Sequence, residues 1–481
     1  MQSRFSTFAR RHRLEIISFI TGFSLLTYEL AAARVLAPSI GSSTYVWTGV
    51  IGVIIAALSL GFFVGGKVAD SRNAISDLVL LLVIAAMTTI GTLLIYESML
   101  DTIVDAFADS RVQAIAAALT LFAPASFFIG MTSPYLAKLN VISLRSTGQS
   151  IASLDMFNAV GGISGTFVTG FILFGYIGAH QAIGLVAVLL LLASWLILPS
   201  WQWPRRLILS LAVLLFALTP PSAVEGLVRI DTASSHYRVI SGYINNQPVT
   251  GLVTGPNGTQ SAVYTNGRTD LVFWYTNEIS RLTGIRQPGT VLILGGGAFT
   301  LPQYLSTQLP DAQIDAVEID PSLKPISEKY FGYRNPSNVQ EIFTDARAYV
   351  NSTDRRYDAI IVDVYGDTAI PFSFITKEYG EALNKILNPD GVVIANVIGG
   401  FTGPCREAFA AVDTAYRSSL PYVQYSNESG RREQRANQVV VYSKQPIKLS
   451  GLQFLPSFGV APYTDNFAPS ERLYHACQQT A

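Results

Sequence analysis

The sequence predicts a chain of two parts, a bundle of membrane-spanning helices followed by an α/β domain with a parallel sheet. Long apolar segments dominate residues 1–222, ordinary charge density returns after Val224, and residues 286–481 alternate short apolar strands with helical segments. At 481 residues the chain exceeds the size of one ordinary core. We therefore expect a polytopic domain over 1–222, a small β-rich subdomain over 223–285 and an α/β domain over 286–481.

Charge and cysteine content narrow the classes of function. Lysine plus arginine and aspartate plus glutamate number 33 each, and a formal net charge of zero disfavours a basic nucleic-acid surface. Cys405 and Cys477 form no CxxC pair and have no clustered histidine, so we expect no metal site. We interpret them as two buried thiols, with one disulfide as the alternative if this part of the chain is exported.

The apolar segments have the length of membrane spans, which need about 20 residues each. The basic head of the chain leads into the first segment without a small-residue cleavage site, so we interpret it as a first span rather than a signal peptide. A soluble bundle is disfavoured because these segments largely lack a polar face. Six segments qualify, near residues 14–36, 46–66, 78–96, 112–131, 151–175 and 181–199.

A seventh apolar segment, 207–219, leaves the side of the C-terminal part open. Basic loops alternate with uncharged or acidic ones, which places the N-terminus of this multi-pass cell-membrane protein in the cytosol. As a helix, the segment reaches about 20 Å, short of a hydrocarbon core about 30 Å thick. If it spans, the C-terminal part lies outside the cytosol; if it does not, that part stays inside.

Small residues and one ionisable residue in the helical part indicate close helix packing and a buried charge. Gly61 with Gly65 and Gly161 with Gly165 stand at spacings typical of close crossings between membrane helices. Glu29 lies inside the first segment, where it either pairs with a cation on another helix or has a functional role.

Residues 223–285 are predicted to form a small β-rich subdomain. The runs 237–240, 250–254 and 260–264 are rich in β-forming residues, and a Pro-Asn-Gly turn at 256–258 separates the last two. A helix is expected from Asp270, carrying Trp274, Tyr275 and Glu278.

The C-terminal domain shows a Rossmann-like pattern, in which buried strands alternate with helices and form a parallel sheet. The predicted strands are 291–294, 314–317, 340–343, 359–362 and 392–396.

Polar residues directly follow four of these strands and predict a nucleoside site. Gly295 and Gly297 follow the first strand and let backbone approach a ligand closely. Glu318 ends the second and can bind two ribose hydroxyls, while Asp345 follows the third and can accept from an adenine amino group. Asp363 follows the fourth. A dinucleotide fits poorly because the G-x-G-x-x-G phosphate loop is missing and no lysine or arginine is near; a nucleoside sulfonium fits better.

These motifs in order resemble the polyamine aminopropyltransferases, the spermidine synthase family, over about 225–445. The matching segments are 258–261, 275–278, 294–297, 317–320, 344–346 and 357–363. In the helical part, segments 28–30, 41–43, 65–72 and 158–165 resemble the transporter-like region of bacterial proteins in which a membrane bundle is fused to such a domain.

The resemblance implies a methyltransferase-type fold and a transferase of polyamine biosynthesis, in a membrane-bound form. Decarboxylated S-adenosylmethionine, or S-adenosylmethionine itself, would be held without a metal, and an aminopropyl group would pass to a putrescine-like amine with release of methylthioadenosine. Asp363 would deprotonate the amine. It also implies a homodimer. The donor-binding residues would be Gly295, Gly297, Glu318, Asp345 and Ala346, and the amine-binding residues Asp367, Glu278, Gln260 and Tyr365.

This sequence departs from the family pattern at three positions, all in the part of the site that would bind the aminopropyl group of the donor or the acceptor amine. Ala298-Phe299 replaces an acid after the glycines, Asn277 replaces a histidine, and one extra residue separates Asp363 from Asp367. Two alternatives therefore stay open. One is another S-adenosylmethionine-dependent enzyme, either a methyltransferase or one releasing methylthioadenosine; the other is a transporter or sensor with a nucleoside- or polyamine-binding domain. Donor supply favours a cytosolic C-terminal domain.

Overall fold

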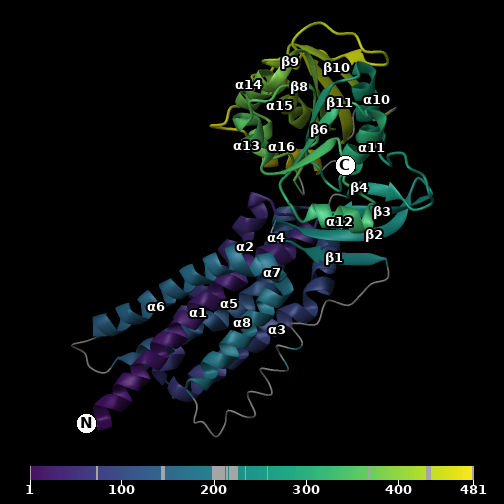
Figure 1. Cartoon of the computed structure of the whole chain (residues 1–481). Coiled ribbons are helices and arrows are strands. Elements are labelled where there is room, and N and C mark those ends of the chain that lie inside the picture. Colours follow the sequence, from purple (N-terminus) through teal and green to yellow (C-terminus); the bar gives the residue numbers. More distant parts are fainter. Residues whose placement is uncertain are drawn as a thin grey trace. The chain divides into compact units, whose positions relative to one another are not determined.

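The computed structural model divides the chain into two compact units, one of helices and one of mixed α/β structure (Figure 1). The helical unit comprises Met1–Ala223 with Asp231–His236, and the α/β unit comprises Val224–Ile230 with Tyr237–Ala481. The structure describes residues 2–71, 74–141, 147–197, 212, 215, 226–232, 234–256, 258–366, 369–428 and 435–478.

The helical unit consists of long apolar helices, two of which run on through a π-helical turn. Its elements are α1 (Gln2–Ile40), α2 (Thr44–Ser71), α3 (Ala74–Ala106), α4 (Ser110–Ala117), the π turn η1 (Ala118–Phe122), α5 (Ala123–Asn140), α6 (Thr147–Val168), the π turn η3 (Thr169–Leu173), α7 (Phe174–Tyr176) and α8 (Ala179–Trp195).

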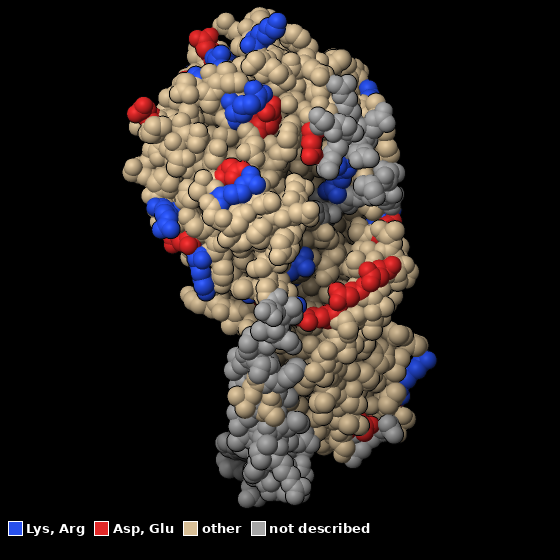
Figure 2. All heavy atoms as spheres, turned by 90° about the vertical axis from the view of Figure 1, so that its right-hand side faces the viewer, with Lys and Arg blue, Asp and Glu red and all other residues tan. Residues whose placement is uncertain are grey.

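Five helical stretches among the described residues are long and apolar enough to cross a membrane. They run over His12–Ile40, Thr44–Ser71, Ile75–Ala106, Ser110–Asn140 and Thr147–Tyr176. The sixth predicted span corresponds to the shorter helix Ala179–Trp195, and the seventh, 207–219, lies outside the described residues except for 212 and 215. Figure 2 shows that the visible face of the helices is largely uncharged, whereas charges of both signs are scattered over the α/β unit.

The glycine pairs lie where helices cross closely, as their spacing predicts. A Cβ atom on Gly61 of α2 would lie 2.2 Å from the carbonyl oxygen of Phe127 in α5. A Cβ atom on Gly161 of α6 would lie 2.1 Å from the carbonyl oxygen of Phe19 in α1. Hydrogen bonds add to the second crossing, since Ser153 donates to Glu15 at 2.6 Å. Glycine is therefore required for both helix pairs to approach this closely.

The α/β unit contains a small antiparallel sheet and a larger mixed one. The small sheet has the order β1-β2-β3-β4, and the three predicted strand runs correspond to its last three members, although the run 250–254 extends one residue past the end of β3. Helix α10 (Trp274–Arg286) follows it. Its strands are β1 (Leu227–Asp231), β2 (His236–Ile244), β3 (Gln247–Val253) and β4 (Thr259–Tyr264).

The larger sheet has the order β12-β10-β11-β9-β8-β5-β6-β7. The five predicted strands are β5 to β9, and they pair in parallel. The sheet as a whole is mixed, because β11 pairs antiparallel with β9 and β10 pairs antiparallel with β11; these two strands were not predicted. The strands are β5 (Thr290–Leu294), β6 (Gln313–Glu318), β7 (Val339–Phe343), β8 (Tyr357–Val362), β9 (Leu387–Gly399), β10 (Tyr422–Asn427), β11 (Ala436–Ser443) and β12 (Gln453–Phe454).

Each face of this sheet has its own hydrophobic core. Along β5, Leu292 and Leu294 belong to one core, and Val291 and Ile293 belong to the other, as the two-residue period of a strand requires. Helices α13 to α16 contribute to the first core and α10 to α12 to the second. The helices that follow α10 are α11 (Thr300–Gln308), α12 (Leu323–Tyr330), α13 (Ala346–Ser352), α14 (Lys377–Ile386), α15 (Arg406–Arg417) and α16 (Ser470–Gln478).

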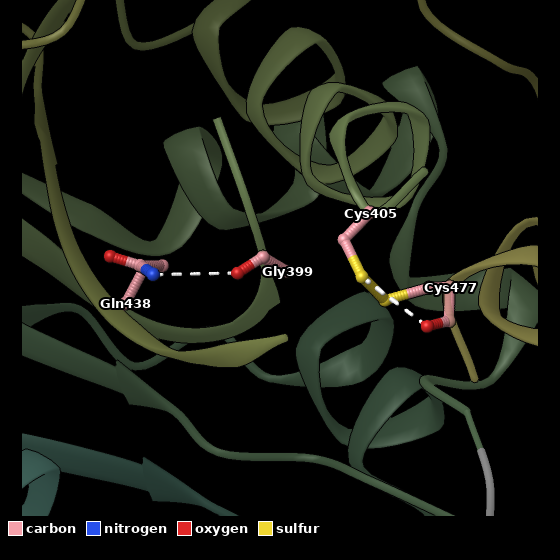
Figure 3. Close-up of a disulfide and its surroundings, with 4 residues drawn as sticks. All are labelled: Gly399, Cys405, Gln438 and Cys477. Atoms are coloured by element: carbon pink, nitrogen blue, oxygen red, sulfur yellow. Dashed lines mark hydrogen bonds between the residues drawn. A yellow bond between two sulfur atoms is a disulfide. The ribbon is translucent and has the colours of Figure 1, made fainter. Parts of the chain in front are cut away.

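A disulfide joins the start of α15 to α16 (Figure 3). It links Cys405, the residue before α15, to Cys477, and both side chains are buried. Our interpretation of the two cysteines as separate thiols is therefore wrong. Spacing in the sequence could not reveal the pair, because the packing of α16 on α15 brings together residues 72 positions apart.

Candidate active site

The predicted nucleoside residues lie at the carboxyl edge of β5 to β8, where open α/β sheets bind ligands. Gly295 directly follows β5 and adopts a positive φ of 96°. A Cβ atom there would lie 2.2 Å from the carbonyl oxygen of Asp363, which directly follows β8. Glycine is therefore needed for the loop after β5 to pass this close to the loop after β8.

Glu318, the last residue of β6, is buried and holds the glycine loop. One carboxylate oxygen accepts from the backbone amides of Gly296 (3.0 Å) and Gly297 (2.9 Å). The other accepts from Ile319 (2.8 Å) and Asp320 (3.1 Å). Burial raises the pKa of Glu318, and these four bonds oppose that rise. Because a carboxylate has about four acceptor positions, ribose hydroxyls would have to replace some of these amides.

Asp345 follows β7 and caps α13. One of its oxygens accepts from the backbone amide of Ala348 at 2.8 Å, and the residue is exposed. Ala346, the first residue of α13, is buried beside it. The capping bond fixes the direction of the Asp345 side chain at the same sheet edge as Glu318.

The departure at Ala298-Phe299 is explained by packing. Ala298 and Phe299 are buried in the core that covers the Val291 face of β5. The Phe299 ring contacts the rings of Tyr333 and Phe343, at centroid distances of 5.0 and 6.3 Å. An acid at position 298 would be buried among apolar side chains, so this loop presents an apolar residue where the family pattern has a carboxylate.

Asp363 is held by two side chains from other elements. One of its oxygens accepts from the Asn396 amide at 2.8 Å, and the Tyr275 hydroxyl of α10 also hydrogen-bonds to it. Neighbouring side chains enclose the carboxyl group, although part of the residue is solvent-accessible; this burial raises its pKa to about 6, and both hydrogen bonds oppose the rise. Such a group is ionised at neutral pH and still basic enough to accept a proton.

Two of the predicted amine-binding residues, Tyr365 and Glu278, already have partners within the protein. Tyr365 donates its hydroxyl to the carbonyl oxygen of Asn396 (3.1 Å) and accepts from the amide of Ile398 (2.6 Å), so it fixes the loop after β8 to β9. Glu278 forms a double ion pair with Arg281, at 2.7 Å for each bond. Burial raises the pKa of Glu278, but hydrogen bonds, chiefly from Arg281, hold it below its usual value.

Gln260 and Asp367 complete the predicted set. The side-chain oxygen of Gln260, on β4, is buried and has no hydrogen-bond partner among the described residues, which makes it an acceptor available to a ligand. The neighbouring Ser261 accepts from the Ala298 amide at 3.1 Å, so β4 lies against the glycine loop. Asp367 lies outside the described residues.

Two residues that hold Asp363 were not predicted as site residues. Asn396 lies in the predicted fifth strand, and Tyr275 lies in the helix expected from Asp270, but neither was given a role in the site. The search for polar residues at the ends of parallel strands, which identified Glu318 and Asp363, would also have selected Asn396. No comparable signal marks Tyr275, because its hydroxyl reaches Asp363 across 88 positions of sequence (363 − 275).

Comparisons with known proteins agree on one domain. Residues 272–402 match the family model of the spermine/spermidine synthase domain. The chain is 34% identical over 114 residues to a polyamine aminopropyltransferase of Vibrio vulnificus, covering 23% of this chain and 38% of that protein. It is 30% identical over 123 residues to a human eEF1A lysine and N-terminal methyltransferase, covering 23% of this chain and 18% of that protein.

One solved structure aligns with about half of the chain. The probable spermidine synthase of Corynebacterium glutamicum aligns with a TM-score of 0.41 at 17% identity, covering 52% of this chain and 99% of that one. The chain spans less than half the length of the curated relatives named above. Residues 272–402 are thus similar to the spermine/spermidine synthase domain, and a unit of long apolar helices precedes them.

Proposed function

We propose that this chain is a membrane-bound aminopropyltransferase, which transfers the aminopropyl group of decarboxylated S-adenosylmethionine to an amine and releases methylthioadenosine. The observation that carries the proposal is Asp363, a carboxylate with a pKa of about 6. It lies beside a glycine loop that Glu318 holds. A general base with a pKa near the working pH combines the correct charge state with a useful driving force for proton transfer.

The proposed step follows from the chemistry of amines. An ammonium ion has no lone pair, so it must lose a proton before it attacks. The neutral nitrogen then forms a bond to the propyl carbon attached to sulfur, the carbon–sulfur bond breaks, and its electron pair stays on sulfur, which becomes a neutral thioether. The proton released from nitrogen passes to the Asp363 carboxylate and then to solvent.

The residues present fit the nucleoside end of such a donor. Asp345 offers an exposed carboxylate with one oxygen committed to its helix cap, and Glu318 offers acceptors that are at present satisfied by backbone amides. Donor binding should therefore release part of the glycine loop from Glu318. Ala346 and the residues from Gly295 to Gly297 would line the same edge.

Turnover by the purified full-length chain tests the proposal. In detergent or nanodiscs with labelled decarboxylated S-adenosylmethionine and amines, we expect methylthioadenosine and a lengthened amine. Asp363→Asn should lower the rate by about 10²- to 10⁴-fold, the usual contribution of a general base. Glu381→Gln, which removes an exposed acid paired with Lys377 on α14, is the matched control and should not change the rate. Equal turnover by Asp363→Asn would exclude this residue as the base.

The buried Ala298 favours one second candidate, a reaction that uses intact S-adenosylmethionine. Without a carboxylate after the glycines, the loop provides no anion to bind an aminopropyl ammonium at that point. Adenosylhomocysteine as the product would indicate methyl transfer, and methylthioadenosine without a lengthened amine would indicate simple donor cleavage. Uptake of polyamine into proteoliposomes without donor turnover would instead indicate a transporter or sensor.

We further propose that the apolar helices anchor the enzyme in a lipid bilayer, as a multi-pass protein of the cell membrane with a cytosolic N-terminus. Their length and composition support this. A homodimer is proposed from family likeness, and light scattering of the purified protein would test it.

A further inference from the structure

Arg435 lies at the same edge of the large sheet as Asp363. It directly precedes β11, whose first residue, Ala436, pairs with Gly399 at the carboxyl end of β9. Since β9 runs parallel to β8, the end of β9 and the start of β11 share the edge from which Asp363 projects. Across the sheet, Glu318 at the end of β6 and Asp345 after β7 lie on one side of β8, and Arg435 lies on the other side.

Among the described residues, Arg435 forms no ion pair with a carboxylate, unlike several other arginines of the unit. Its Nε is buried and makes no hydrogen bond within the described part of the chain. By contrast, Arg281, Arg347 and Arg417 each contact a carboxylate at 2.7 to 2.9 Å. Burial lowers the pKa of Arg435, and the neighbouring Tyr474 and Tyr365 oppose that fall. A half-buried cation without a counter-charge is costly, and a ligand anion would offset that cost.

The surroundings of Arg435 belong to the amine side of the site. Tyr365 and Tyr474 interact electrostatically with the guanidinium, and their rings lie 6.4 Å apart at an interplanar angle of 81°. The Tyr365 hydroxyl accepts a hydrogen bond from the amide of Ile398, and Ile398 pairs with Asn437, two residues after Arg435. Tyr474 lies on α16, which the disulfide to Cys405 holds close to the end of β9 (Figure 3). Arg435 is therefore packed beside the loop that carries the proposed base.

We infer that Arg435 selects the acceptor, and that the acceptor is an amine with an anionic group, such as a carboxylate, at its far end rather than a diamine. This inference rests on the proposed aminopropyl transfer. Asp363 receives the proton from the reacting nitrogen, and Arg435 pairs with the anion.

Sheet geometry supports this assignment. From β8 to β11 there are two strand spacings, roughly 10 Å in all, so an acceptor whose amine lies at Asp363 can extend toward Arg435. A diamine would bring a second ammonium toward the guanidinium, and like charges at close range discriminate strongly against a ligand. Glu278 does not offset this, because its carboxylate is already paired with Arg281.

Three amines with the same four-carbon chain separate the possibilities, because they differ only at the far end. These are 4-aminobutanoate, 1,4-diaminobutane and 1-aminobutane, which carry a carboxylate, an ammonium and a methyl group. With the purified full-length chain and decarboxylated S-adenosylmethionine, we expect the highest kcat/KM with 4-aminobutanoate. Arg435→Gln should lower that value by about 10- to 100-fold, as expected for loss of a charge-assisted hydrogen bond. Arg435→Lys should restore part of it.

Several measurements keep this test independent of folding and of turnover. The rate with 1-aminobutane should stay within about twofold in Arg435→Gln, since that probe has no charge to lose. Arg286→Gln is the matched control, because Arg286 contacts the carbonyl oxygen of Asp390 away from the site and should leave all three rates unchanged. Calorimetric binding of the three amines in the presence of methylthioadenosine gives the same ranking without catalysis.

The outcomes distinguish this inference from the proposed function. Methylthioadenosine production with a preference for 1,4-diaminobutane that Arg435→Gln leaves unchanged would overturn the role of Arg435 and keep the transferase. Arg435-dependent binding of 4-aminobutanoate without transfer from any donor would keep the anion site and reject the transferase. If Arg435→Gln instead raised the KM of intact S-adenosylmethionine alone, the guanidinium would serve the donor and the inference would be wrong.

Discussion

The hydrogen bond from Asn396 to Asp363 gives a prediction whose size follows from the structure. The Asn396 amide donates to the carboxylate at 2.8 Å and stabilises its ionised form. Removing the donor in Asn396→Ala must therefore raise the pKa of Asp363 above its value of about 6. A hydrogen bond to a charged group contributes about 1.5–3 kcal/mol, or about one to two pKa units. Water can reach part of this residue and replace the lost donor, so we expect a shift of about one unit.

The assay is the ratio of kcat/KM between Asn396→Ala and the unaltered protein as a function of pH. The ionised fraction of the base sets the acidic limb, so a pKa moving from about 6 to about 7 lowers the rate about threefold at pH 6.5 and barely at pH 8. Titration of the amine substrate affects both proteins equally and cancels in the ratio. Tyr275→Phe should shift the limb in the same direction, because the Tyr275 hydroxyl also hydrogen-bonds to Asp363.

The chain offers a close control in Asn388, which also lies on β9 and donates to an aspartate, Asp358, at 2.7 Å. Asn388→Ala removes the same kind of bond at the opposite end of β8 and should leave the limb in place. If the limb of Asn396→Ala stayed within about 0.3 pH unit of the original, or moved to lower pH, Asp363 would not be the titrating base.

Three further predictions concern stability. The folded pKa of Asp363 lies above the usual value of 3.8, so the contribution of its protonated carboxyl group to stability is fully present below about pH 4 and is lost as the pH rises through about 6. Asp363→Asn keeps a neutral side chain at every pH. It should therefore raise the free energy of unfolding at pH 8 by up to about 3 kcal/mol, measured by denaturant titration. Gly161→Ala should destabilise the helical unit by about 1–3 kcal/mol because its Cβ would meet Phe19, whereas Gly170→Ala, with open space around it, should not, as thermal unfolding in detergent would show. Ala298→Asp should lower the melting temperature rather than improve donor binding, since the new carboxylate would be buried; tighter donor binding in a stable variant would contradict this.

The sequence was sufficient for the features that repeat or follow a local rule. The strands β5 to β9 were recognisable because each is a short apolar run with polar residues directly after it, and the glycine crossings because their spacing matches a helical turn. Strands β10 and β11 were not predicted, and their antiparallel pairing adds an edge to the sheet that no motif marks.

The contacts that give the site its chemistry were less accessible from sequence. Four backbone amides already satisfy Glu318, Arg281 neutralises Glu278, and Tyr275 reaches Asp363 from another element. Each depends on how separate segments pack, and residue type and strand position alone do not specify that packing.

The disulfide bears on which side of the membrane the reaction takes place. Such bonds persist in oxidising compartments, and closing a loop of 72 residues contributes about 4 kcal/mol by the chain-entropy relation. If segment 207–219 crosses the membrane as a seventh span, a cytosolic N-terminus would put the α/β unit outside the cytosol. We therefore expect Cys405 and Cys477 to resist a thiol-reactive polyethylene glycol in acid-quenched cells until a reductant is added.

Two reactive thiols without reductant would instead indicate six crossings and an α/β unit that meets a cytosolic donor directly. The assay of the purified enzyme does not depend on this result, because the donor is added directly to the protein and no membrane separates them. The labelling result therefore determines where a nucleoside donor must be available in the cell, whereas Asp363→Asn determines whether the site can use one.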